Sequence, residues 1–176
     1  MNTEEETSDA IWKLRDFAWK VAGPREFFIN VILNAALAWI CYWKADYVTI
    51  AGAAPILAYL GPMSFLLPLL TTFFGYMNGV IARRNGIGPP WPEGLAWKKR
   101  ALLAGLLRGV LLCPISISLG LAFHHFLFDG KLPLFAGMTA IGLIAGIAGY
   151  LLHAWAIECA GRLETKSQKG YGYRTD

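Results

Sequence analysis

Four long stretches of apolar residues run through the chain, and almost all charged residues lie outside them. The stretches cover residues 27–43, 54–82, 101–128 and 133–160. A helix needs about 20 apolar residues to cross the ~30 Å hydrocarbon core of a bilayer. Each stretch reaches or approaches that length, so the pattern predicts an all-α integral membrane bundle of four transmembrane helices.

The residues before the first stretch have an amphipathic pattern. Over residues 8–22, Lys13 and Lys20 share one side of a helix and apolar residues occupy the other, with tryptophans at the margin. A cationic helix of this kind beside a span usually lies in the headgroup layer, so we expect an N-terminal interfacial helix. The alternative is a solvated helix that docks on the second connection. Gly23 and Pro24 are expected to break this helix before the first span.

Basic residues predict the orientation of the chain. Of the 16 Lys and Arg residues, all but Lys44, Arg108 and Lys131 lie in the N-terminal segment, the second connection and the C-terminal tail. With four spans these three regions share one side, which the positive-inside rule places in the cytoplasm. The expected location is therefore the cell membrane, a bacterial inner membrane, with both termini cytoplasmic.

Composition supports a membrane domain between two polar ends. Only 16% of the residues are charged, whereas soluble domains usually carry about 25%. We expect a cytoplasmic segment with the amphipathic helix over 1–25, the transmembrane domain over 26–161 and a cytoplasmic polar tail over 162–176. The expected partners are the bilayer and its anionic headgroups at the cytoplasmic face. Nucleic acid is not indicated, because the net charge of +4 is concentrated at the ends of the spans.

Small residues recur at a four-residue spacing in three stretches. The GxxxG pairs are Gly75 with Gly79, Gly105 with Gly109, and Gly142 with Gly146. Glycine at this spacing lets membrane helices approach closely, which predicts a compact bundle. The same pattern also fits a contact with a second copy or with another membrane protein.

Polar residues inside the stretches are the candidate functional residues. By helical rise they fall at a similar depth, toward the cytoplasmic face: Asn30, Asn34, Asn78, Arg108, His153 and Glu158. One interpretation is a polar cavity open to the cytoplasm, in which Arg108 binds an anionic headgroup or substrate. The alternative is that Arg108 reaches the headgroups or pairs with Glu158, while the asparagines form hydrogen bonds between helices.

The sequence indicates no catalytic residues, metal ligands or cofactor. It contains no phosphate-binding loop, no HExxH motif and no evident nucleophile–base set. Cys41, Cys113 and Cys159 are far apart, with no paired or metal-binding spacing. We therefore expect a protein that is not an enzyme.

Three features of the first half of the chain occur together: Asn30-x-x-x-Asn34 leading to Ala38-Trp39, the run Phe-Leu-Leu-Pro-Leu-Leu-Thr-Thr over 65–72, and Arg83-Arg84. Together they resemble a group of small four-span bacterial membrane proteins whose activity is uncharacterised. The resemblance implies the four-span topology and carries no activity with it.

These observations favour a non-enzymatic accessory, assembly or envelope-homeostasis factor that acts through helix–helix contacts. A small oligomeric transporter or channel, with a polar cavity around Arg108, is the alternative. A membrane enzyme acting on lipid headgroups has the least support, because the spans contain no evident acid–base pair.

Overall fold

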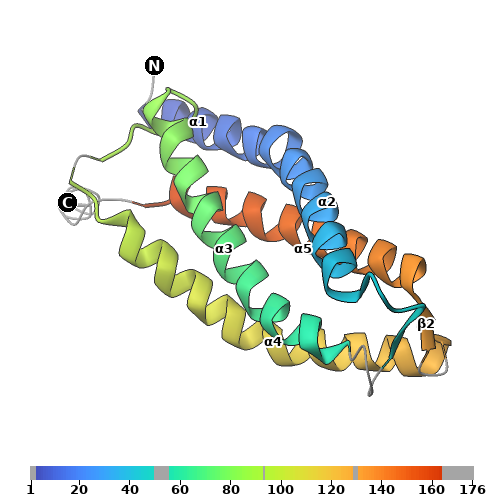
Figure 1. Ribbon diagram of the computed structural model, residues 1–176. Helices are drawn as coiled ribbons and strands as arrows, with labels where there is room; N and C mark the ends of the chain where they lie inside the picture. Colours follow the sequence, from blue (N-terminus) through green and yellow to red (C-terminus); the bar gives the residue numbers. More distant parts are fainter. Residues whose placement is uncertain (1–2, 50–55, 93, 129–130, 164–176) are drawn as a thin grey trace.

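The computed structural model describes residues 3–49, 56–92, 94–128 and 131–163. Most of these residues are helical, and Figure 1 shows the long helices with short strands at one end of the molecule. In chain order the elements are α1 Thr3–Phe17, the π-helical turn η1 Ala18–Ala22, α2 Gly23–Tyr42, β1 Tyr47–Thr49, α3 Leu57–Arg84, α4 Trp97–Phe128, β2 Lys131–Pro133 and α5 Leu134–Gly161.

Four helices are long and apolar enough to cross a membrane. They are the continuous helix that ends with α2, together with α3, α4 and α5, and they coincide with the four predicted stretches. The predicted helical class and the number of candidate spans are therefore confirmed for the part of the chain that the structure describes. Residues 54–55 of the second stretch and 164–176 of the tail lie outside that part.

The expected helix break at Gly23 and Pro24 is wrong, because helical structure continues from α1 through η1 into α2. The Gly23 N–H bonds to the Ala18 carbonyl, five residues back. In this π pattern the Trp19 carbonyl faces position 24, where proline has no N–H to donate. The Tyr150 hydroxyl donates to the Trp19 carbonyl at 3.1 Å instead. The helix can therefore bend there without leaving that carbonyl unpaired (Figure 1).

Helix α1 docks on the rest of the molecule through Leu14, which is buried. Leu14 packs against Gly88 in the second connection and Gly161 at the end of α5. Gly88 has a positive φ of 105°, and a Cβ there would lie 2.9 Å from Leu14 Cβ, so both backbone and space favour glycine. Helix α1 therefore docks on the second connection. Its placement in a headgroup layer stays a prediction.

The four long helices pack in the order α2, α5, α3, α4, with each pair of neighbours in contact. The predicted glycine pairs make this close approach possible. Gly75 meets α5 at Ala156, Gly109 meets α3 at Phe65, and Gly146 meets α2 at Val31. These small residues therefore form contacts within one chain, as the compact-bundle interpretation predicts.

A short antiparallel pairing of β1 with β2 joins the first and third connections, with Val48 opposite Leu132. His124 of α4 is fully buried, and its Nε2 lies 2.9 Å from the Val48 carbonyl oxygen. We call this part of the molecule the sheet end, and the opposite part, where α1 covers α3 and α5, the α1 end. The pairing was not predicted, because strands of three residues leave almost no pattern in the sequence.

Candidate functional site

The six candidate polar residues do not form one cluster around Arg108. Instead, they belong to three separate sets of contacts between helices. Asn30, Asn34, Asn78 and His153 belong to the first, Arg108 to the second and Glu158 to the third.

The first set begins as a ladder along one face of α2. Asn30 Nδ2 donates to the backbone carbonyl of Glu26 and to its Oε1, each at 3.0 Å. Asn34 Nδ2 donates to the Asn30 carbonyl at 2.9 Å. From α3, the Tyr59 hydroxyl donates to the Asn34 carbonyl oxygen and to its Oδ1, at 3.0 and 2.9 Å. The two asparagines are therefore used in hydrogen bonds within α2 and with α3.

The same set reaches α5 through His153, which is fully buried. Asn78 Nδ2 of α3 lies 2.9 Å from His153 Nε2, and His153 Nδ1 lies 3.7 Å from Glu26 Oε2. With Asn78 as the donor, a neutral imidazole has its proton on Nδ1, toward the carboxylate. Sequence reasoning missed Glu26, although it stands one helical turn before Asn30.

Arg108 of α4 forms the second set. Its guanidinium donates to Thr72 Oγ1 at 3.1 Å and to Cys159 Sγ at 3.8 Å, and its Cζ lies 3.8 Å from the ring centroid of Trp155. Arg108 thus connects α4 to α3 and α5. Among the described residues it forms no ion pair with Glu158, so the pairing considered from the sequence is not formed.

Glu158 forms the third set, at the α1 end. Its Oε1 accepts a hydrogen bond from Trp19 Nε1 and lies 3.5 Å from Arg15 Nε. Its Oε2 lies 3.9 Å from a guanidinium nitrogen of Arg162. The carboxylate therefore holds α1 and η1 against the end of α5.

Arg83 was used from the sequence as a topology signal and as part of the resemblance, and was not expected to be buried, yet it is 4% exposed. Its guanidinium donates to the Pro89 and Pro90 carbonyls at 2.8 and 2.7 Å. It also donates to the Ala160 and Leu163 carbonyls at 2.7 and 3.1 Å. One side chain thus joins the end of α3, the second connection and the end of α5. The sequence offers no signal that separates it from the exposed Arg84.

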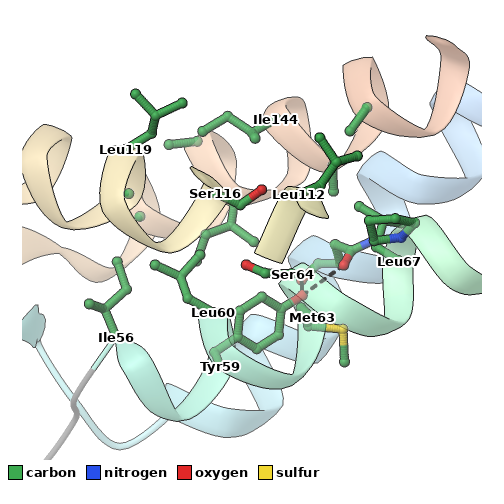
Figure 2. A pocket seen from close by; sticks show the side chains of 18 of the residues that line it. Ile56, Tyr59, Leu60, Met63, Ser64, Leu67, Leu112, Ser116, Leu119 and Ile144 are labelled. Carbon is green, nitrogen blue, oxygen red and sulfur yellow. Dashed lines mark hydrogen bonds between the residues drawn. The ribbon is translucent and has the colours of Figure 1, made fainter. Parts of the chain in front are cut away.

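An apolar cavity of about 610 Å³ lies between α3, α4 and α5, toward the sheet end. This volume is within the ~300–1,000 Å³ range of small-molecule sites. Figure 2 shows Leu119 of α4 and Ile144 of α5 on one side of the cavity and Leu60 of α3 on the other. Leu119 and Ile144 are 66% and 59% exposed, so the cavity opens between α4 and α5 onto the apolar outer surface.

The polar side chains that line this cavity are few and uncharged. Among the residues that the structure describes, they are Asn34, Tyr59, Ser64 and Ser116, with no charged residue and no histidine. The dashed lines in Figure 2 mark the hydrogen bonds of Tyr59, which use the Asn34 acceptors. The cavity was not predicted, because its walls come mostly from side chains on three helices that are distant in sequence.

Metal or disulfide chemistry finds no support in the described ranges. No group of three or more His, Cys, Asp or Glu residues is placed there to hold a metal ion. The three cysteines are free thiols.

Comparison of the chain with models of protein families, with curated proteins and with solved structures finds no match. The resemblance to small four-span bacterial membrane proteins therefore stays a prediction.

Proposed function

We propose that this is a non-enzymatic multi-pass membrane protein that binds the apolar chain of a membrane-resident molecule in the cavity between α3, α4 and α5. The observation that carries the proposal is the cavity itself: about 610 Å³, apolar in its lining and open between two helices. An accessory or envelope-homeostasis role, as the sequence favours, is compatible with binding of this kind.

The proposal includes a membrane location and an orientation. Four helices of sufficient length and apolar character support a multi-pass protein of the bacterial inner membrane. The basic residues at the α1 end support a cytoplasmic position for both termini, with α1 in the headgroup layer. The cavity then lies in the outer part of the hydrocarbon region. A lipid-like chain would enter it sideways, between α4 and α5.

A binding role is favoured over catalysis by the chemistry of the lining. Hydrolysis or group transfer needs a base, an acid or a metal beside the reacting atom. The cavity presents two serine hydroxyls, and its described lining residues include no histidine and no charged side chain. The lining supports holding a chain in place and gives no partner that would activate either serine.

The oligomeric transporter or channel remains the second candidate. It needs a polar path, and the sequence placed one around Arg108. The guanidinium of Arg108 is engaged by Thr72, Cys159 and Trp155. Arg108 is also not among the residues that line the cavity. The geometry therefore supports binding of an apolar chain better than passage of an ion.

Photolabelling tests the proposal. Heptadecane with a diazirine at mid-chain is added to the protein in lipid nanodiscs, and labelled peptides are identified by mass spectrometry after irradiation. We expect lining peptides of α3, α4 and α5 to be labelled several-fold more than the exposed face of α2 around Ile32, which reports contact with bulk lipid.

A cavity-filling variant provides the matched comparison. Ala140→Phe with Ala148→Phe adds two rings to the lining and should remove the excess labelling. Ala36→Phe adds one ring on the exposed face of α2 and should leave the labelling of the lining unchanged. Equal labelling of the lining and of the α2 face, unaffected by the filling variant, would contradict the proposal.

A further inference from the structure

Two serine hydroxyls in the apolar cavity have no hydrogen-bond partner among the described residues. Ser64 of α3 is only 7% exposed, and Ser116 of α4 is half-buried. Both belong to the lining, and Figure 2 shows them between α3 and α4. A serine inside a helix usually bonds to the carbonyl four residues back, as Thr139 does to Phe135. Neither cavity serine does so, and each hydroxyl keeps a free donor.

Free donors in this position are informative because the other polar lining groups are satisfied. Tyr59 donates to Asn34, and Asn34 donates to Asn30. A hydroxyl that faces an apolar cavity without a hydrogen-bond partner is in an unfavourable environment. A ligand that supplies an acceptor between Ser64 and Ser116 removes this penalty, whereas a pure hydrocarbon chain does not.

The lining also restricts the charge of the ligand. None of the described lining residues is charged, so an ionised carboxylate or phosphate would lose its hydration without gaining an ion partner among them. An uncharged oxygen has no such penalty. A carbonyl oxygen has two lone pairs and can accept one hydrogen bond from each serine.

We propose that the cavity binds an uncharged lipophile that carries a carbonyl oxygen, with Ser64 and Ser116 donating to that oxygen and the apolar walls holding its chain. This inference rests on the proposed binding function and defines the class of ligand for that site.

Competition against the diazirine probe tests it. Heptadecane and 9-heptadecanone have the same chain length and differ by one carbonyl group. When both are titrated into the same nanodiscs, we expect the ketone to displace the probe from the cavity at a mole fraction about fivefold lower than the alkane. This agrees with the roughly two- to tenfold effect of one net hydrogen bond. Heptadecanoate at neutral pH should compete no better than the alkane.

The serine variants identify the donors. In the double variant that combines Ser64→Ala with Ser116→Ala, the probe should still label the cavity. The concentrations of ketone and alkane that displace it should then agree within twofold. Ser118→Ala removes an exposed hydroxyl from α4 outside the lining and should behave as the wild type. Each single variant should lose part of the ketone preference, which keeps the test valid if the double variant is unstable.

The outcomes separate the two proposals. Specific labelling of the cavity with equal competition by ketone and alkane overturns the serine assignment and leaves apolar-chain binding in place. A ketone preference that survives in the double alanine variant also overturns it. Absence of specific labelling overturns the binding function, and the ligand class falls with it.

Discussion

At the residue scale, Arg83 and Arg84 are adjacent in sequence and have opposite environments. Arg83 is buried, and its guanidinium donates to carbonyl oxygens of the second connection and of the end of α5. Arg84 is exposed. Hydrogen bonds from a buried charged donor are strong, and loss of the donor leaves several carbonyl groups unpaired. The stability of the α1 end should therefore depend on one of these arginines and not on the other.

Arg83→Met should lower the free energy of unfolding by about 2–3 kcal/mol, because it removes hydrogen bonds from a charged donor to buried carbonyl oxygens. Thermal unfolding in detergent measures it. Arg84→Met removes the same charge from the same helix end and should change stability by less than about 0.5 kcal/mol. Equal effects of the two variants would show that the charge near the membrane, and not the carbonyl contacts, is what matters.

Arg108→Ala should also destabilise the fold, by about 1–3 kcal/mol, because it removes a charge-assisted hydrogen bond and the contact with the Trp155 ring. Lys99→Ala, at an exposed position on the same helix, is the control. An Arg108→Ala protein that unfolds like the wild type would favour the other interpretation from the sequence, in which Arg108 is kept for an anionic ligand.

At the scale of secondary-structure elements, glycine decides how closely the helices approach. A Cβ at Gly75 would lie 2.6 Å from Ala156 Cβ and 2.8 Å from the His153 carbonyl oxygen. At Gly61, on the same helix, the added Cβ has no atom within 4 Å beyond the neighbouring residues and backbone of its own helix. The two positions therefore separate the packing role of glycine from its effect on helix propensity.

Gly75→Ala should destabilise the protein by about 1–3 kcal/mol, because α3 and α5 must move apart. Gly61→Ala should be neutral or stabilising, by up to about 1 kcal/mol, because alanine restricts the unfolded chain. Chemical denaturation in detergent compares the two variants. Destabilisation of similar size at both positions would contradict the close contact between α3 and α5.

The helices themselves were predictable because their signal is local: about 20 apolar residues in a row, bounded by charge. The continuous helix through Gly23 and Pro24 was not, because it depends on a hydroxyl from Tyr150 in another helix. The β1–β2 pairing depends in the same way on contacts between distant connections. At this scale, the sequence predicted the features that depend on residues close together in the chain.

At the scale of the whole molecule, the candidate site could be predicted only in part. Hydrogen bonds of the asparagines between helices were one of two interpretations of the sequence, and in the structure Asn34 bonds to Tyr59 of α3 and Asn78 lies 2.9 Å from His153 of α5. The division of the polar residues into three sets, and the position of the cavity, depend on how four helices rotate against one another. A single sequence contains no direct information about that rotation. Polar residues at a similar depth were therefore predicted to form a single group.

The depth of the cavity in the bilayer depends on the proposed membrane topology. So does the side of the membrane from which each end of the molecule is accessible. It predicts that the first connection and the second connection face opposite sides of the bilayer. Lys44 and Asn85 are exposed positions in these two connections. Single cysteines at the two positions, with the three native cysteines replaced by alanine, report the side directly.

The measurement is labelling of intact spheroplasts with a membrane-impermeant maleimide, before and after the membrane is opened. We predict that Lys44→Cys is labelled in intact spheroplasts, and that Asn85→Cys is labelled only after opening. Labelling of both cysteines from the outside, or of neither, would contradict a four-span protein with both termini in the cytoplasm.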